Sequence, residues 1–326
     1  MKKILALLLA LWIPAAVLSG CAPQDDSAAS NKLNIVTTIF PAYDWVREIL
    51  GDETDRAEIT MLLDSGVDLH SYQPTVDDIV KISDCDLFLY VGGESDGWVE
   101  DALKNAPNKE RKVIRLLDVL GDSAKAEETV EGMQEEEHDH EEEAEYDEHI
   151  WLSLKNAQVL VAAISEALQE SDPARKDTYA ANAAAYAEKL SALDGEYRAA
   201  VDSGKYKTLL FGDRFPFRYL ADDYGLDYYA AFPGCSAETE ASFETVSFLA
   251  GKMDALGLPC VLTIEGTQHK IAKTIVQNTA QKNQQVLTMD SMQAVTANDA
   301  ASGVSYLSIM EKNLSVLKKA LGQEAE

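Results

Sequence analysis

The sequence predicts an α/β protein with two lobes, each containing a mainly parallel sheet, joined by a long rigid helix. Short apolar runs alternate with helical patterns in residues 32–155 and again in residues 204–326. This alternation is typical of a parallel sheet covered by helices on both faces. Between the two halves, an alanine-rich stretch has apolar residues at spacings of three and four, which predicts connector helices within residues 156–203. That apolar stripe consists of Tyr179, Ala183, Tyr186, Leu190, Leu193 and Tyr197.

The first lobe is predicted from strand-like runs and from helix start signals. A β-branched run opens it at residues 33–38, and the continuous apolar run at 87–91 suits a buried parallel strand. Thr75, followed by two acidic residues, is a typical N-cap. The predicted strands are 33–38, 57–63, 87–91 and 113–117, and the predicted helices are 41–50, 75–83 and 98–104.

The second lobe repeats the alternation without a close sequence repeat of the first. Helices over about 157–170 and 173–201 precede it, the latter introduced by Asp172-Pro173. Its predicted strands are 208–211, 228–231, 260–264 and 285–288, and its predicted helices are 216–224, 243–256, 271–281 and 306–321.

The charge of the chain excludes several classes of partner. With 28 Lys and Arg against 56 Asp and Glu, the net charge is −28, which repels nucleic acid and anionic membrane surfaces but attracts cations. Hydrophobic residues make up 46%, enough for ordinary packed cores. Residues 123–148 are strongly acidic and almost free of apolar side chains, which predicts a disordered loop within the first lobe.

The N-terminus predicts export and lipid anchoring. Two lysines and a short apolar run form a signal peptide over residues 1–20, too short to span a bilayer. Leu18-Ser19-Gly20-Cys21 matches the bacterial lipobox, so Cys21 is expected to become the lipidated N-terminus. Residues 21–31 then form a flexible tether, and the protein is expected outside the cytoplasm, anchored to the cell membrane by lipid.

Five histidines carry the candidate chemistry. His138 and His140 lie in the acidic loop, where they are candidates for auxiliary metal capture, although a solvated acidic linker explains the composition as well. His70 and His149 lie where a strand or loop ends, the usual place for ligands in an open α/β sheet. Sequence spacing alone leaves a structural hydrogen-bonding role equally open for these two.

Three motifs resemble the solute-binding lipoproteins of zinc and manganese ABC importers. His70-Ser71-Tyr72-Gln73-Pro74 resembles the first ligand loop of that family, and Asp147-Glu148-His149-Ile150-Trp151-Leu152 is similar to its Asp-Pro-His-Ile-Trp-Leu motif. The run from Ser305 to Leu321 resembles its last helix. The resemblance covers roughly residues 33–322, and the acidic loop with histidines is a feature of the zinc members.

The resemblance implies a metal site in the cleft between the lobes, with two ligands from each lobe. By position, His70 and His149 are the first pair, and Asp290 matches the last carboxylate ligand, although Asp at such a place is also a common helix cap. The third ligand departs from the pattern, because Arg214 stands where the family has His or Glu, and Arg cannot ligate. The adjacent Asp213 is the preferred replacement. Water, Glu265 and His269 are the alternatives.

Three cysteines remain after lipidation. Cys85 precedes an apolar strand and is expected to be a buried thiol. Cys235 and Cys260 lie in the same lobe, and an exported protein permits a disulfide between them.

The predicted function is capture of Zn²⁺ and its delivery to the membrane permease of an ABC importer, by a monomer that is not an enzyme. Mn²⁺ or Fe²⁺ as cargo is the alternative within the family. An exported zinc hydrolase, with Glu265 as base, is a rival from another class, but the chain lacks a HExxH signature. A surface lipoprotein with a purely structural metal is a third possibility.

Overall fold

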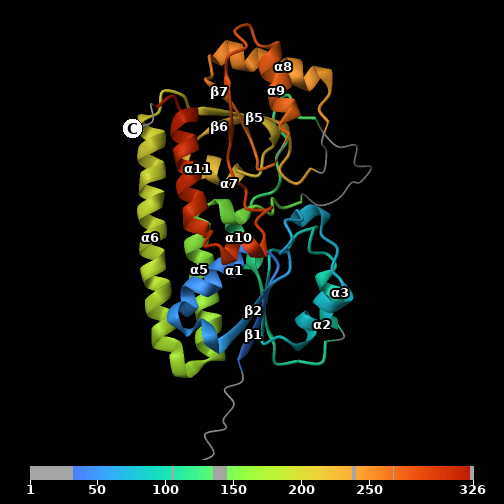
Figure 1. Ribbon diagram of the computed structural model, residues 1–326, viewed down its shortest axis with the longest axis vertical. Helices are drawn as coiled ribbons and strands as arrows, with labels where there is room; N and C mark the ends of the chain where they lie inside the picture. Colours follow the sequence, from blue (N-terminus) through green and yellow to red (C-terminus); the bar gives the residue numbers. More distant parts are fainter. Residues whose placement is uncertain (1–31, 105, 135–144, 237–239, 267, 324–326) are drawn as a thin grey trace, which may run out of the picture. The chain divides into compact units, whose positions relative to one another are not determined.

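Two parallel sheets organise the structure, a computed structural model that describes residues 32–104, 106–134, 145–236, 240–266 and 268–323 (Figure 1). The strand orders are β2-β1-β3-β4 and β6-β5-β7-β8, and every pairing is parallel. The first sheet contains β1 (Leu33–Thr37), β2 (Ala57–Met61), β3 (Leu87–Tyr90) and β4 (Lys112–Arg115), and the second contains β5 (Thr208–Arg214), β6 (Asp227–Phe232), β7 (Cys260–Thr263) and β8 (Gln285–Thr288). The predicted α/β class with two parallel sheets is confirmed.

Helices follow most strands, as the alternation predicts. The helices of the first lobe are α1 (Phe40–Leu50), α2 (Val76–Asp84), α3 (Val99–Lys104) and α4 (Leu116–Leu120). Those that follow are α5 (Leu154–Ser171), α6 (Lys176–Ser203), α7 (Arg218–Tyr224), α8 (Phe243–Leu256), α9 (Lys270–Asn278), α10 (Ala297–Ala301) and α11 (Tyr306–Ala320). Short 3₁₀ turns lie at η1 (Gly51–Arg56), η2 (Leu69–Ser71), η3 (Gly121–Ser123), η4 (Ile150–Leu152) and η5 (Pro173–Arg175).

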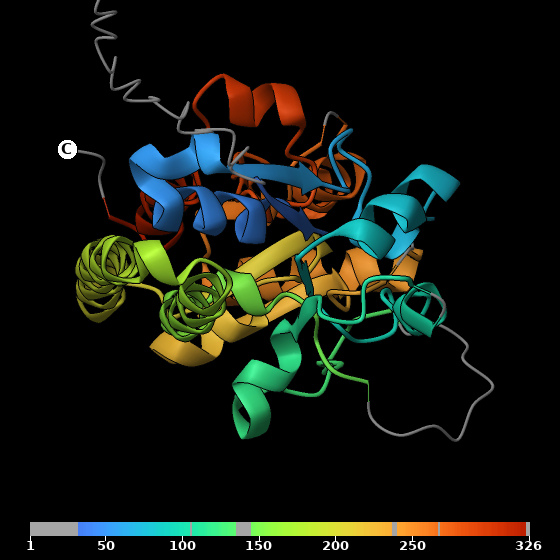
Figure 2. The same ribbon diagram turned by 90° about the horizontal axis from the view of Figure 1, so that it is seen from below.

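The connector is the 28-residue helix α6. Its predicted apolar stripe is buried, and the helix packs against α5, α1 and α11 (Figure 1). Figure 2 shows α5 and α6 nearly end-on and side by side. The hydroxyl of Tyr197 donates to the carbonyl of Met310 at 2.7 Å, so a residue of the connector is fixed to the last helix of the chain.

The same strand order in both sheets determines where functional loops lie. In an open parallel sheet, ligands bind outside the carboxyl ends of the strands, where the loops to the next elements begin. In the first sheet these loops carry His70 after β2 and Ser95 after β3. In the second sheet they carry Cys235 after β6 and Asp290 after β8, while Asp213 is the penultimate residue of β5.

Both described ends of the acidic loop contact other parts of the chain. Ala126 and Tyr146 form an isolated antiparallel bridge. The backbone N–H of Lys125 donates to the Tyr219 hydroxyl at 2.9 Å, and that of Gln134 donates to the carbonyl of Ala231 at 2.9 Å. The Tyr219 hydroxyl in turn donates to the carbonyl of Asp147 at 3.0 Å, so the loop is attached to the second lobe on both sides of residues 135–144. Three predicted functional residues, His138, His140 and the lipidated Cys21, lie outside the described residues.

A buried carboxyl group on α1 makes folding stability depend on pH. Asp44 accepts the backbone N–H of Tyr306, the first residue of α11, at 2.9 Å, and burial raises its pKa from 3.8 to about 6. The folded chain therefore holds this proton after the unfolded chain has lost it. The free energy of unfolding therefore falls by about 3 kcal/mol as the pH rises from ~4 to ~6, because the contribution of this proton is lost.

The variant Asp44→Asn keeps an acceptor for the Tyr306 N–H but has no proton to lose. We expect its stability relative to the parent chain to increase by about 3 kcal/mol between pH ~4 and pH ~7. Urea unfolding of both chains at the two pH values measures this difference. An equal difference at both pH values would show that Asp44 does not titrate as described.

Candidate metal centre

His70 and His149 are held by the same local arrangement in two different loops. His70 is the middle residue of η2, and the carboxylate of Asp68 accepts its backbone N–H at 3.0 Å. His149 directly precedes η4, and the carboxylate of Asp147 accepts its backbone N–H at 2.9 Å. In each loop an Asp two residues before the His fixes the backbone, so the direction of the imidazole is set locally.

The two imidazoles meet through their Nε2 atoms, which are 3.2 Å apart. The ring centroids are separated by 5.1 Å and the rings are tilted by 55°. Two His nitrogens on one tetrahedral Zn²⁺ ion would lie about 3.3 Å apart, given Zn–N bonds of about 2.0–2.1 Å. The observed separation therefore matches a pair of metal ligands.

The outer Nδ1 atoms are engaged by oxygen atoms. Nδ1 of His149 lies 2.9 Å from Oδ1 of Asp147, and Nδ1 of His70 lies 2.8 Å from Oγ of Ser95 and 3.5 Å from Oε2 of Glu148. The other oxygen of Glu148 accepts the Ser95 N–H at 2.8 Å. Metal-binding histidines are oriented in this way, because a partner on one nitrogen leaves the lone pair of the other directed at the metal.

Burial shifts the pKa values of His70 and Glu148 in opposite directions. Burial and the neighbouring His149 imidazole lower the pKa of His70 to about 3, so its ring is neutral at neutral pH. Burial raises the pKa of Glu148 to about 7. A neutral imidazole is the form that binds a metal ion, so His70 is ready to bind without first losing a proton.

Cys235 completes a cluster with the two histidines. Its Sγ and one nitrogen of each ring all lie within 4.8 Å of one another, and this is the one such group of three or more His, Cys, Asp or Glu among the described residues. Burial and the carboxylates of Asp147, Glu127 and Glu148 raise the pKa of the Cys235 thiol well above its ordinary value.

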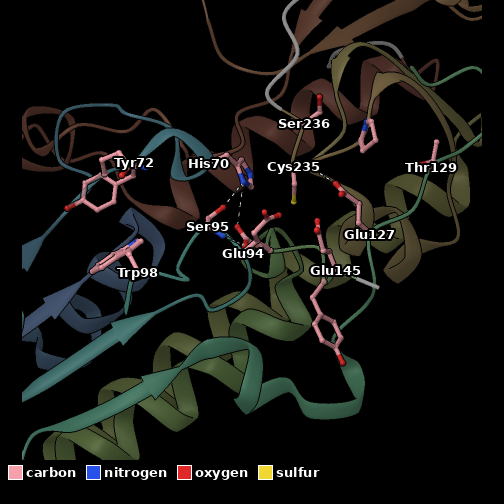
Figure 3. A pocket seen from close by; sticks show the side chains of 14 residues that line it. His70, Tyr72, Glu94, Ser95, Trp98, Glu127, Thr129, Glu145, Cys235 and Ser236 are labelled. Carbon is pink, nitrogen blue, oxygen red and sulfur yellow. Dashed lines mark hydrogen bonds and ion pairs between the residues drawn. The ribbon is translucent and has the colours of Figure 1, made fainter. Parts of the chain in front are cut away.

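The cluster borders an acidic cavity of about 580 Å³, into which Figure 3 shows His70 and Cys235 projecting. Four carboxylates line this cavity, those of Glu94, Glu127, Glu145 and Glu148. Such a concentration of negative charge raises the local concentration of cations.

The sequence interpretation missed Cys235 as a candidate ligand. It considered Cys235 only as a possible disulfide partner of Cys260, but both thiols are free in the described chain. Cys260 is instead buried at the start of β7, whereas Cys235 follows β6 at the opposite, ligand-binding end of the sheet. The signal in the sequence was a Gly-Cys pair three residues after the end of a predicted strand.

The predicted carboxylate ligands lie outside this cluster. Asp213 and Asp290 are absent from the group formed by His70, His149 and Cys235. Burial raises the pKa of Asp213, and burial together with the Glu265 carboxylate raises the pKa of Asp290 to about 6. Their roles as ligands remain predictions.

The two alternative ligands have other surroundings. Glu265 accepts the backbone N–H and the hydroxyl of Ser291, both at 2.7 Å, and the backbone N–H of Gln293 at 3.0 Å, so its oxygens hold the loop after β8. His269 adopts a left-handed backbone conformation with φ of 45°. It lines a second cavity, of about 530 Å³, together with Asp213 and His70.

Arg214, at the position where the family pattern has a ligand, joins the two lobes. One Nη donates to Oδ2 of Asp68 at 2.5 Å, and the other donates to the carbonyl of Ser236 at 3.1 Å. Burial alone would raise the pKa of Asp68, but the Arg214 guanidinium holds that pKa below its ordinary value. Because Asp68 also holds the backbone of His70, this guanidinium connects the His70 loop to the Cys235 loop.

Comparison with known proteins finds matches over most of the chain. The model of a family described as zinc-uptake complex component A, periplasmic (ZnuA), matches residues 35–320. The zinc-binding lipoprotein AdcA of Streptococcus pneumoniae serotype 4 is 34% identical over 329 residues, covering 99% of this chain and 62% of that protein. The high-affinity zinc uptake system protein ZnuA of Bacillus subtilis is 29% identical, covering 89% of this chain and 88% of that protein.

A solved structure shows the same fold. The Zn(II)-bound ZnuA-like domain of Streptococcus pneumoniae AdcA aligns with a TM-score of 0.70 and 30% identity, covering 90% of this chain and 100% of that domain. The chain thus spans about 62% of the length of the first curated relatives and the whole of their ZnuA-like domain.

Proposed function

The chain belongs to the zinc-uptake complex component A family, and we propose that it captures Zn²⁺ outside the cytoplasm and delivers it to the permease of an ABC importer. The observation that carries this proposal is the His70–His149 pair. Its Nε2 atoms are 3.2 Å apart, and both Nδ1 atoms are engaged by oxygen atoms. Two imidazoles oriented in this way suit Zn²⁺ better than Mn²⁺, which favours oxygen ligands.

The ligand set follows from the two lobes. His70 and His149 are the ligands from the first lobe, and Asp290 and Asp213 are the candidate carboxylates from the second. Both carboxylates follow or end strands of the second sheet, at the edge where parallel sheets bind ligands. Ligands from both lobes would let the ion hold the lobes together, and its release would allow them to separate.

The acidic surroundings serve capture. The cavity beside the histidines is lined by four glutamates, and the whole chain carries a net charge of −28. His138 and His140, within the acidic loop, are proposed to bind metal weakly before transfer to the main site. A flexible site has an ordering cost and therefore binds less tightly than a preformed one.

The protein is proposed to work at the outer face of the membrane, attached through a lipid on Cys21. Within the part of the chain that the structure describes, no helix has the length and apolar character needed to cross a bilayer. Stable anchoring by lipid requires more than one acyl chain.

Catalysis is not part of the proposal. A metal ion whose coordination positions are filled by protein ligands leaves none for an activated water molecule, which a zinc hydrolase requires. Members of this family are the binding components of transporters. A screen of the zinc-loaded chain against ester, peptide and phosphoester substrates separates the two classes, and zinc-dependent turnover would favour the hydrolase.

Metal content and competitive titration test the proposal. A chain starting at Lys32 is suitable, because the residues from Lys32 onward form one compact unit. We expect one tightly bound Zn²⁺ per chain, tighter binding of Zn²⁺ than of Mn²⁺, and a metal-free chain that retains its circular dichroism spectrum. Tighter Mn²⁺ binding would change the cargo, and unfolding on metal removal would indicate a purely structural ion.

A further inference from the structure

We propose that Cys235 supplies a thiolate ligand to the transported ion, with Arg214 as the residue that positions it. This inference rests on the proposed function, because it assigns a third donor to the same site. The observation behind it is the cluster of His70 and His149 nitrogens with Cys235 Sγ, all within 4.8 Å of one another. The donor comes from the second lobe, as a site between two lobes requires.

The backbone brings Cys235 close to His149 in a way that only glycine permits. A Cβ atom on Gly234 would lie 2.9 Å from the carbonyl oxygen of Phe215 and 3.2 Å from Nδ1 of His149. The loop can therefore pass directly beside the imidazole, and the next residue is Cys235. Its own backbone N–H donates to Oε1 of Glu127 at 2.8 Å, which attaches this turn to the acidic loop.

Arg214 holds the opposite side of the same turn. Its guanidinium binds the carbonyl of Ser236, the residue after the cysteine, and the carboxylate of Asp68, which in turn fixes the backbone of His70. A guanidinium is planar and always charged, so it fixes both partners in one geometry without binding the metal. Arg214 cannot bind the metal itself, but it holds the loop that carries Cys235. In this way the thiol of Cys235 replaces the ligand that the family pattern has at position 214.

The chemistry of the step is simple. Zn²⁺ replaces the thiol proton, which passes to solvent, and a Zn–S bond of about 2.3 Å forms. A thiolate is a soft ligand and favours Zn²⁺ over Mn²⁺. His70, His149 and Cys235 would then supply three donors, and one of the candidate carboxylates, Asp213 or Asp290, would complete a tetrahedral site.

Cobalt(II) is the probe that tests this bond, because a thiolate on Co²⁺ produces intense charge-transfer absorption in the near ultraviolet and imidazole or carboxylate does not. We expect the metal-free chain to show this absorption on addition of Co²⁺, and Cys235→Ala to bind Co²⁺ without it. We also expect Zn²⁺ affinity to fall on the order of 100-fold in Cys235→Ala, since even an outer partner of a ligand is worth about 10–100-fold. The ratio of Zn²⁺ affinity to Mn²⁺ affinity should decrease in the same variant.

Cys260→Ala is the matched control, because Cys260 is also a free thiol of the second lobe but is buried at the start of β7. It should keep the absorption and the affinity. Absorption that persists in Cys235→Ala, or is absent from the parent chain while Co²⁺ binding depends on His70, overturns the thiolate assignment and leaves the proposed function intact. Metal binding that does not depend on His70 overturns the proposed function itself.

Arg214→Gln tests the positioning role. We expect it to weaken the charge-transfer absorption at saturating Co²⁺, with Arg214→Lys intermediate, because the two loops lose their common partner. A purely structural role would lower the unfolding temperature of the metal-free chain without changing the absorption of the loaded chain, and that result would contradict positioning.

Discussion

The double variant His70→Ala, His149→Ala is expected to lose tight Zn²⁺ binding, by at least on the order of 1,000-fold. The reason is that both Nε2 atoms face one point, with their outer nitrogens already engaged by Ser95 and Asp147. Loss of a hydrogen-bond partner of a ligand costs about 10–100-fold in metal affinity. Loss of the ligand itself costs more, and this variant loses two ligands. Competition against a chromogenic zinc chelator measures the difference.

His269→Ala is the control for the loss of a histidine. His269 is partly exposed, lies outside the cluster, and was an alternative ligand on sequence grounds, so unchanged affinity in this variant removes that alternative. Tight binding that survives in the double variant would place the main site elsewhere. The variant His138→Ala, His140→Ala would then show whether the acidic loop holds it.

Trp151→Ala is expected to destabilise the chain by about 4 kcal/mol or more. The indole is buried, and its N–H donates to the carbonyl of Ser291 at 2.8 Å, which loses this donor in the variant. Truncating a buried Trp typically costs 3–5 kcal/mol, and an unpaired buried carbonyl adds about 1–3 kcal/mol. Urea unfolding of the metal-free chain measures this cost.

Trp98→Ala removes the same side chain from a half-buried position at the edge of the acidic cavity. It should cost clearly less than Trp151→Ala, since less apolar surface is lost from the core. Equal costs would show that the complete burial of Trp151 and its hydrogen bond to Ser291 add nothing to stability. Because the Trp151 ring lies 5.4 Å from that of His149, Trp151→Ala should also weaken Zn²⁺ binding.

Local patterns in the sequence were enough to predict the elements of the sheets. The apolar run predicted at 285–288 is β8 (Gln285–Thr288), and the run predicted at 33–38 is β1 (Leu33–Thr37). Helices α4 (Leu116–Leu120) and α10 (Ala297–Ala301) were not predicted, because five residues are too few to show a helical period, and the first two residues of α4 were predicted as strand. The three-residue turn η4, whose apolar residues are all buried, is too short to show a period for the same reason.

The site was predictable only where its contacts are local. The Asp-x-His pattern of Asp68 with His70, and of Asp147 with His149, lies within three residues. The partners of Arg214 are far away in sequence, since Asp68 precedes it by 146 residues. Cys235 and the two histidines lie in loops that are far apart in the sequence, and no pattern within one segment shows that these loops meet.

Anomalous diffraction at the zinc absorption edge, from crystals of the zinc-loaded chain, tests the central claim most directly. The account predicts one peak at about 2.0–2.1 Å from Nε2 of His70 and of His149 and at about 2.3 Å from Sγ of Cys235. A peak at bonding distance from both histidines but not from sulfur would contradict the thiolate ligand. A zinc ion held only by residues 135–144, with the histidine pair empty, would contradict the account as a whole.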